Sequence, residues 1–411
     1  MASDHDRPPG ATDVRDAEVD VCIVGAGPVG ATLACRLAAG GVRVAVIDRA
    51  ALPPMEHPDF DGRAYAIAAG SRRLLEAAGV WERLPRPSCP IEGIRVSDGR
   101  PGQPASPLFL HFDQPAPGEP FGWMTEARSL RVALNDTLHA SALVRLQAPD
   151  EARVVRGPAH ATIVTSSGTT LRARLVVAAE GRESRLRAEA GIPVTRFAYR
   201  QTGIVSAVAH ERPHGNIALE HFLPGGPFAQ LPMSGGEAGE HLSAIVWTER
   251  EAPATRLASL DDAAFGRELQ RRLGHHLGAV RPVGRRWTYR LGALHAHRYV
   301  AGRLALIGDA AHGIHPIAGQ GLNLGFRDVV ALSALVIEAV AAGRDPGEAA
   351  LLARYQAQRR PANLAMLAAT DVLDRLFSTD NPALRLARGL GIGAVHRLPR
   401  LKRAFVAQAM A

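Results

Sequence analysis

The chain has 411 residues, of which 46% are hydrophobic, 21% charged and 5% aromatic. This composition excludes disordered, collagen-like and coiled-coil proteins, and the length predicts two or three structural units, because one hydrophobic core rarely exceeds about 250–300 residues. The formal net charge is +8. Basic and acidic residues alternate along most of the chain, however, and few aromatic residues accompany them, so a nucleic-acid partner is not favoured.

Cysteine usage and the apolar segments bear on the cellular compartment. Cys22, Cys35 and Cys89 fit no disulfide framework and no metal-binding spacing, which favours a reducing compartment. Residues 1–18 contain Pro, Asp and Arg without an apolar stretch and are predicted to form a disordered tail, not a signal peptide. The longest apolar run, Val329–Gly343, contains a glutamate and is shorter than the roughly 18–20 residues that span a bilayer. A cytoplasmic protein without a transmembrane helix is therefore predicted.

The first ordered segment predicts a nucleotide-binding βαβ unit. A β-branched run over Val19–Gly25, an apolar helix over Ala31–Ala39 and a second strand over Val42–Asp48 follow one another. The turn between the first strand and the helix has a Gly-x-Gly-x-x-Gly pattern formed by Gly25, Ala26, Gly27, Pro28 and Gly30. The glycines allow a tight turn, close approach to a pyrophosphate and close helix packing, and the helix N-terminus favours an anion. Asp48, with Arg49 behind it, favours a free ribose 2′-hydroxyl, as in FAD or NAD.

The middle of the chain predicts a different architecture. Helices are expected over Gly70–Leu84 and Trp123–Ala142, and a hairpin over Ala161–Val177. Four β-patterned runs separated by turn signals follow: Gly203–Ala209, Ile217–Leu223, Phe228–Pro232 and Leu242–Thr248. They predict an antiparallel sheet inserted into a nucleotide-binding domain.

A second glycine-rich helix start lies late in the chain. Arg303–Gly308 is a predicted buried strand, Asp309 follows it, and a long helix is expected over Leu322–Ala342. The connecting segment and the helix start contain His312, His315, Pro316, Gly319, Gln320, Gly321, Leu322 and Asn323. A dehydrogenase that uses NAD needs one such loop. A monooxygenase that uses FAD needs two, one for the pyrophosphate and one for the ribityl chain and flavin ring.

Six separated sequence blocks point to one family. They are Gly25–Gly30; Gly62–Ile67 with Gly70–Leu75; Ala127–Leu130; Ala179–Gly181 with Ser184 and Arg187; Phe222–Phe228 with Pro232; and Gly308–Asn323. Together they resemble the ubiquinone-biosynthesis flavin hydroxylases, a branch of the class A flavoprotein monooxygenases with the p-hydroxybenzoate hydroxylase fold. The resemblance extends from Val19 to Met410, and the last block is its most specific part.

The resemblance implies an α/β fold in which a Rossmann-like FAD-binding domain carries an inserted antiparallel β-sheet substrate domain and C-terminal helices. The FAD-binding domain is expected to comprise residues 19–85, 121–200 and 291–345. The substrate domain is expected at 86–120 and 201–290, followed by a C-terminal helical region at 346–411.

The resemblance also implies roles for individual residues. Asp309 would hold the ribityl chain, and the backbone of Gly319–Asn323 would lie against the flavin pyrimidine edge, where the helix N-terminus favours the negative charge of reduced flavin. Arg128 would contact FAD. Arg63 and Pro316 would lie beside the flavin ring and are the two candidate catalytic residues, with Pro316 marking the reaction chamber.

One block departs from the family pattern. Glu180 and Gly181 stand where relatives usually have Asp-Gly, in a motif that the family uses for both FAD and the nicotinamide donor. The carboxylate is retained but lies one methylene further from the backbone. Binding of the donor is therefore less strongly predicted than binding of FAD.

The implied chemistry is a ring hydroxylation that consumes NAD(P)H and O2. Reduced FAD captures oxygen as a hydroperoxide on ring carbon 4a and delivers OH to an electron-rich arene. Holding a phenol of pKa about 10 as its anion at pH 7 costs about 4 kcal/mol, which a base or cation near the hydroxyl would offset. His221, His312 and His315 lie near the blocks, but the last two are better explained as loop-shaping side chains. No acid, base or metal site is assigned.

The C-terminal stretch Leu384–Ala411 contains basic and apolar residues and no Asp or Glu. It is either a solvated helical cap or a surface that contacts anionic lipid, at the inner face of the membrane, or a quinone-synthesis complex. Three functions stay open. The chain could hydroxylate a polyprenylated phenol or benzoquinol in ubiquinone biosynthesis, hydroxylate a soluble aromatic or secondary metabolite, or serve as a flavin-binding accessory protein of a quinone-synthesis complex.

Overall fold

The computed structural model of the protein describes residues 17–52, 62–99, 102, 110–114, 118–236, 239–315 and 319–377. Of the predicted disordered tail, residues 1–16 lie outside the described residues, and Ala17 and Glu18 open the first strand. Pro316 and the basic stretch Leu384–Ala411 also lie outside them.

The first sheet carries the first glycine turn. Its strand order is β17-β18-β11-β1-β2-β8, with β10 paired to β11 and β9 to β10. The strands are β1 (Ala17–Val24), β2 (Val44–Ile47), β8 (Val144–Gln147), β9 (Ala152–Arg156), β10 (Ala161–Thr165), β11 (Thr170–Ala178), β17 (Val300–Ala301) and β18 (Leu304–Leu306). Because β1, β2, β8, β11 and β18 run parallel, their carboxyl ends meet at one edge of the sheet, where open α/β folds bind ligands.

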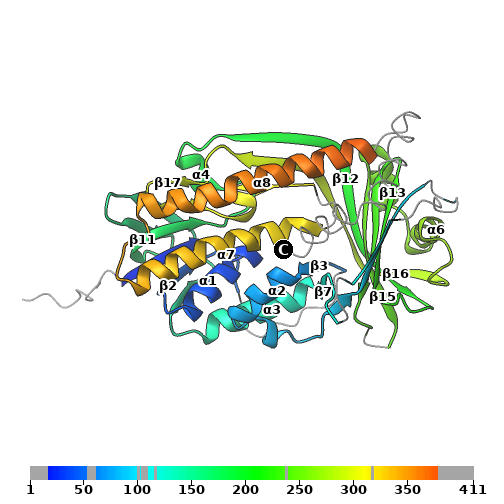
Figure 1. Ribbon diagram of the computed structural model, residues 1–411, viewed down its shortest axis with the longest axis horizontal. Coiled ribbons are helices and arrows are strands. Elements are labelled where there is room, and N and C mark those ends of the chain that lie inside the picture. Colours follow the sequence, from blue (N-terminus) through cyan, green and yellow to red (C-terminus); the bar gives the residue numbers. More distant parts are fainter. Residues whose placement is uncertain are drawn as a thin grey trace, which may run out of the picture.

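The helices pack on the sheets and on one another (Figure 1). The described helices are α1 (Pro28–Ala39), α2 (Ala69–Ala77), α3 (Ala127–Ala140), α4 (Arg185–Glu189), α5 (Glu251–Ala258), α6 (Asp262–Leu273), α7 (Gln320–Ala341) and α8 (Ala349–Phe377), with short 3-10 turns η1 (Trp81–Arg83) and η2 (Gly308–Ala310). α1 contacts α3 and α7, and α7 contacts α8. A Cβ on Gly325 of α7 would lie 2.6 Å from the Val29 side chain of α1, so a glycine is needed where these two helices cross.

The second sheet has the strand order β19-β16-β12-β15-β14-β13-β5-β6. Its strands are β5 (Gly93–Asp98), β6 (Leu110–Asp113), β12 (Val194–His210), β13 (Ile217–Leu223), β14 (Gly226–Met233), β15 (His241–Arg250), β16 (Val280–Ala296) and β19 (His312–Gly313). All pairings are antiparallel except that of β13 with β5. Phe228 and Trp247 pack with Phe265 of α6 in a buried cluster, which covers one face of the sheet.

A small third sheet, β3-β7-β4, lies between the helices α2 and α3 and the second sheet (Figure 1). Its strands are β3 (Ala64–Ala68), β4 (Cys89–Ile91) and β7 (Gly122–Glu126). It brings β3 next to the start of α7, which it contacts. This contact places the second glycine turn beside the segment that follows Arg63.

The α/β fold with an antiparallel sheet is confirmed, and all four β-patterned runs lie in strands of the second sheet. Two helix predictions were wrong in their limits. Trp123–Glu126 belongs to β7, because these residues pair with β3, and the helix begins at Ala127. The helix predicted over Gly70–Leu84 ends at Ala77, since Gly79 takes a φ of +68° that stops it. The limits of the domains remain a prediction.

The three cysteines are free and buried. Among the residues that the structure describes, no helix is both long and apolar enough to cross a membrane.

Candidate active site

One cavity of about 1320 Å³ connects the two glycine-rich turns. Its wall is formed by α1, α7, η2, the small sheet and one face of the second sheet. The described lining residues from the turns are Gly27, Pro28, Gly30, Gly308, Asp309, Gly319, Gln320, Gly321, Leu322 and Asn323. Segments about 290 residues apart in the chain therefore face one continuous space. This arrangement is expected of a site that binds one extended dinucleotide.

The three glycines of the first turn have different surroundings. A Cβ on Gly25 would lie 2.4 Å from the carbonyl oxygen of Ala179, and one on Gly30 would lie 2.0 Å from that of Gly25. By contrast, nothing lies within 4 Å of a Cβ added to Gly27. Gly25 and Gly30 thus permit the packing of the turn, whereas Gly27 keeps the N-terminus of α1 open toward the cavity.

Asp48 stabilises the first turn from the end of β2. The backbone N–H of Ala26 donates to its Oδ2 at 2.6 Å, and that of Ala50 donates to Oδ1 at 2.8 Å. Arg49 is exposed, and neither Asp48 nor Arg49 is among the described lining residues. The predicted contact of Asp48 with a ribose stays a prediction, and holding the turn is what its carboxylate does in the structure.

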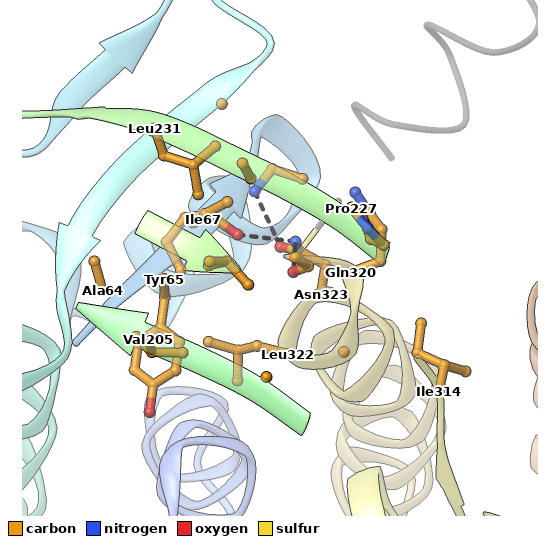
Figure 2. Close-up of a pocket in the computed structure, with 18 of the residues that line it drawn as sticks. Ala64, Tyr65, Ile67, Val205, Pro227, Leu231, Ile314, Gln320, Leu322 and Asn323 are labelled. Carbon is orange, nitrogen blue, oxygen red and sulfur yellow. Dashed lines mark hydrogen bonds between the residues drawn. The ribbon is translucent and has the colours of Figure 1, made fainter. Parts of the chain in front are cut away.

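The second turn is tied to the small sheet by Asn323 (Figure 2). Asn323 is 1% exposed. Its Nδ2 donates to the carbonyl oxygen of Ala66 at 2.9 Å, and its Oδ1 accepts from the N–H of Ala68 at 3.0 Å. Gly319 precedes α7 with a φ of +62° and offers no side chain to cap the helix. The first N–H groups of α7 therefore begin at the cavity wall, which Gly319–Asn323 line.

A buried carboxylate, Asp328 of α7, fixes the turn between β18 and β19. It accepts hydrogen bonds from the N–H of Gly308 at 3.0 Å and from Nε2 of His312 at 2.5 Å. Arg359 and Asn363 of α8 donate to its other oxygen at 2.8 and 3.1 Å. Burial acts to raise the pKa of Asp328, but His312 and Arg359 outweigh it and lower the pKa. His312 is thus a structural residue of the turn. The sequence favours this interpretation of His312, as a loop-shaping side chain, over a catalytic one.

Sequence reasoning missed this cluster. A signal was available, since Asp328 lies on the buried face of an otherwise mainly apolar helix, where a carboxylate requires a partner. Its partners could not be identified in the same way, because Arg359 and Asn363 lie on a different helix. The sequence gives no indication of how α8 is rotated against α7.

Comparison with known proteins identifies the family. A family model described as an FAD binding domain matches residues 18–370. The chain belongs to this family. The ubiquinone hydroxylase UbiL of Rhodospirillum rubrum is 50% identical over 98% of this chain and 93% of its own length. The 3-demethoxyubiquinol 3-hydroxylase of Escherichia coli is 34% identical over 93% of this chain and 96% of its own length. The resemblance to ubiquinone-biosynthesis hydroxylases is thereby confirmed.

A solved structure shows the same fold. The crystal structure of p-nitrophenol 4-monooxygenase PnpA from Pseudomonas putida superposes with a TM-score of 0.75, covering 95% of this chain and 98% of that one. The sequence identity is 19%, so this similarity concerns the fold alone.

The cavity fits the FAD that defines the family. Nothing lies within 4 Å of a Cβ added to Gly27 or Gly321, so both turns leave room for close approach of a ligand to the backbone. Neither Gly27 before α1 nor Gly319 before α7 provides a capping side chain, and helix N-termini of this kind favour anionic groups. One cavity with two such termini suits a cofactor that has a pyrophosphate and a ring that becomes anionic.

Near the second turn, Asp309 and Glu180 differ in what they face. Asp309 lines the cavity and pairs with Arg182 at 3.2 Å. Glu180, in contrast, accepts from the Ser184 hydroxyl at 2.6 Å and from the N–H of Leu186 at 3.1 Å, at the start of α4. Only Gly181 of the Glu-Gly pair is among the described lining residues. The longer side chain of Glu180 therefore has a structural use at α4.

The two arginines of the family pattern are held by protein groups. The Arg63 guanidinium carbon lies 4.3 Å from the centre of the Trp287 ring. Arg128 donates through Nε to Glu126 at 2.6 Å. Neither is among the described lining residues, and Pro316 lies outside the described part of the chain. Their predicted contacts with FAD stay predictions.

The remaining wall of the cavity is mainly apolar. Side chains from β3, β12, β14 and α7 converge on it (Figure 2). Its described lining residues from the second sheet and the adjoining segments include Ile91, Ile94, Val96, Leu110, Phe112, Phe121, Val205, Ala218, Phe222, Ala229, Leu231, Val246, Leu291 and Ile314. Such a wall excludes water and accommodates a hydrocarbon ligand.

The other candidate histidines do not line this space in the described structure. His221 is buried and hydrogen bonds through Nδ1 to the Ser97 hydroxyl at 2.5 Å; burial lowers its pKa. His315 is buried against Gln201 and Asp374, with Nε2 at 3.3 and 3.6 Å from their oxygens. The acidic residue that does line the apolar wall is Glu220, which the sequence analysis missed.

Proposed function

We propose that this protein is an FAD-dependent monooxygenase that hydroxylates a polyprenylated phenol or benzoquinol ring in ubiquinone biosynthesis, with NAD(P)H as electron donor and O2 as co-substrate. The observation that carries the proposal is the single cavity that joins both glycine-rich turns to an apolar chamber. Membership of the FAD binding domain family and 50% identity to a ubiquinone hydroxylase support it.

The chain's own residues would hold the cofactor at its two ends. The N–H groups at the start of α1, beside Gly27, would bind the pyrophosphate, and Asp48 would accept from the ribose. Asp309 would accept from the ribityl chain. The N–H groups of α7 around Gly321 would lie against the pyrimidine edge and favour negative charge there. Bound FAD would supply the activation of O2, from which one oxygen atom would enter the ring.

Residues of the family pattern further from the cavity wall would act at its margin. Arg128 would contact FAD after exchanging part of its pairing with Glu126, and Arg63 and Pro316 would lie beside the flavin ring. Gly181 would leave room for FAD or the nicotinamide donor, because nothing lies within 4 Å of a Cβ added there.

The apolar chamber favours the polyprenylated substrate over a soluble aromatic acid. Its wall offers hydrocarbon and aromatic side chains for a prenyl tail, and few charged groups that would recognise a free carboxylate. Exclusion of water by the same wall protects a reactive oxygen species from unproductive decay. A soluble substrate would require a more polar pocket.

We further propose that the basic stretch Leu384–Ala411 contacts anionic lipid or a quinone-synthesis complex. The reason is that a polyprenylated substrate of this protein would be held in the membrane. Truncation after Ala383 should reduce binding to anionic liposomes and product formation in cells, while turnover of a short-chain substrate in solution is retained. Unchanged liposome binding and cellular product formation would contradict this part of the proposal.

The cofactor proposal is tested by a pair of glycine variants. Gly27→Ala should fold normally, since its Cβ meets no atom within 4 Å. It should lose bound flavin, because the added methyl group would occupy the space proposed for the pyrophosphate. Gly302→Ala is the matched control, because this glycine also has room for a Cβ and is not among the described lining residues. Flavin absorbance of the purified proteins and their unfolding midpoints give the comparison. Asp309→Ala should weaken flavin binding as well.

The substrate proposal needs two measurements. NAD(P)H oxidation stimulated by a prenylated phenol, with a hydroxylated product, would exclude the accessory-protein alternative. Profiling of quinone intermediates in a deletion strain would then identify the missing ring hydroxyl. Wild-type protein that binds no flavin, or that binds it and forms no product from any phenol, would refute the proposed activity.

A further inference from the structure

Glu220 occupies the middle of the apolar wall. It lies in β13, and the residues two positions before and after it, Ala218 and Phe222, line the cavity with it. In the register of the sheet its neighbours are Val96 on β5 and Ala229 on β14, and both of these also line the cavity. Because side chains alternate along a strand, this face of the sheet presents one carboxyl group surrounded by apolar side chains.

No protein group in the described part of the chain hydrogen bonds to the Glu220 carboxyl or pairs with it as an ion. Placing a carboxylate in apolar surroundings without a partner opposes folding, so its presence there calls for a role other than stability. Burial alone raises the pKa of Glu220 to about 7. Near neutral pH this carboxyl can therefore both accept and release a proton.

The other ionisable groups around the cavity are engaged or lie at its rim. Asp309 and Arg182 pair with each other, and Arg290 is exposed to solvent. On the adjoining strands the facing residues Val96 and Ala229 do not ionise, and Asp98 lies at the end of β5. The remaining ionisable side chains of the described wall are Tyr65 and Tyr289. Among the described residues of this wall, the carboxyl oxygens of Glu220 are therefore available to a ligand, whereas those of Asp309 face Arg182.

Resting on the proposed monooxygenase function, we propose that Glu220 is the general base that accepts the proton of the substrate's ring hydroxyl. The O–H bond of the ring hydroxyl breaks, the proton moves to a Glu220 oxygen, and the electron pair stays on the ring oxygen. This charge raises the electron density at the ring carbons that react. After the ring carbon has gained oxygen and lost its own proton to solvent, Glu220 returns its proton to the ring oxygen and is ionised again.

The position explains why a glutamate serves better here than a nearby histidine. His221 follows Glu220 directly and therefore points to the opposite face of the sheet, where it bonds to Ser97. His312 is bound to Asp328. A general base works best when its pKa is near the working pH, and the apolar wall provides this for a carboxyl group.

The decisive variant is Glu220→Gln, which keeps the shape of the side chain and removes the base. Glu249→Gln is the matched control, since Glu249 is in the same sheet but not among the described lining residues. With 2-prenylphenol as the probe, kcat at pH 7 should fall about 100-fold or more in Glu220→Gln, whereas bound FAD and the rate of FAD reduction by NAD(P)H stay as in the wild type. The control should keep wild-type kcat.

The pH profile distinguishes a base from a structural residue. Wild-type kcat should rise with an inflection near pH 7, because Glu220 must be ionised. In Glu220→Gln this inflection should vanish, and activity should recover as the pH approaches about 10, where the phenol ionises by itself. Glu220→Asp should keep an inflection and a part of the activity. This variant also decides the case if Glu220→Gln does not fold.

The outcomes separate this inference from the proposed function. If the wild type hydroxylates 2-prenylphenol and Glu220→Gln keeps its kcat and its pH profile, Glu220 is not the base, although the enzyme is a monooxygenase. If Glu220→Gln does not fold and Glu220→Asp keeps both the wild-type kcat and an unshifted inflection, the inference is also wrong. A wild type that binds FAD but hydroxylates no phenol would overturn the proposed function itself.

Discussion

Replacing Asp328 by alanine should destabilise the protein and release the turn that carries Gly308. The substitution removes one carboxylate that accepts four hydrogen bonds, from Gly308, His312, Arg359 and Asn363. Arg359, whose side chain is 11% exposed, would then remain buried without its anion. Removing one partner of a buried ion pair costs about 3–5 kcal/mol. This is a large part of the roughly 5–15 kcal/mol that stabilises most folds.

Chemical unfolding measures the effect, with the free energy of unfolding obtained from the urea dependence of fluorescence. Asp328→Asn should cost less, about 1–3 kcal/mol, because its amide oxygen still accepts but its NH2 group faces a donor. Glu338→Ala is the control on the same helix, since the pair of Glu338 with Arg344 is exposed and is expected to contribute about 0–1 kcal/mol. The explanation is refuted if Asp328→Ala costs no more than Glu338→Ala.

Three further predictions follow from other parts of the structure. Gly30→Ala should lower the free energy of unfolding by about 3 kcal/mol, because its Cβ would lie 2.0 Å from the Gly25 carbonyl oxygen. Equal urea midpoints for Gly30→Ala and the wild type would contradict the role of Gly30 in packing the first turn. Asn323→Leu should weaken FAD binding and lower the free energy of unfolding by about 1–3 kcal/mol, because two backbone groups of β3 lose their hydrogen-bond partner. Unchanged flavin affinity in a fluorescence titration would show that FAD binding does not depend on the hydrogen bonds between α7 and β3. Burial lowers the pKa of His295 from its ordinary value near 6.5 to about 4. Between these two pH values the unfolded chain binds a proton at His295 that the folded chain does not. The free energy of unfolding should therefore fall by about 2–3 kcal/mol as the pH drops from 6.5 to 4. His295→Gln should flatten that part of the stability profile measured by urea unfolding, and an equally steep profile would assign the effect to other groups.

The sequence was sufficient for the features that local chemistry determines. The strand, turn and helix of the first βαβ unit depend on glycine spacing and on a short β-branched run, and α1 lies where this pattern places it. The same holds for β13, whose limits match the predicted run Ile217–Leu223. The helix predicted at Trp123 was wrong at its start because residues 123–126 pair with β3, a contact that no local pattern encodes.

Glu220 illustrates a second limit of the sequence. Alternation along β13 places it on the same face as Ala218 and Phe222, but the pattern does not tell whether that face meets α6 or a cavity. The answer depends on how the second sheet is positioned against the small sheet and α7. A glutamate between apolar residues reads as a surface position until that arrangement is known. The roles of Asp48 and Glu180 were similarly obscured, because both carboxylates bond to backbone groups near them in the fold.

The two sides of the cavity are stabilised by separate sets of contacts, and this has a functional consequence. The turns are held by Asp48, Asn323 and Asp328, whose partners lie in the first sheet, the small sheet and the helices around them. The wall that carries Glu220 is supported from behind by the cluster of Trp247 and Phe265. Since the two sets share no residue, a substitution on one side should leave the other intact. Loss of flavin and loss of hydroxylation with flavin retained should therefore be separable effects, the first from changes at the turns and the second from changes in β13.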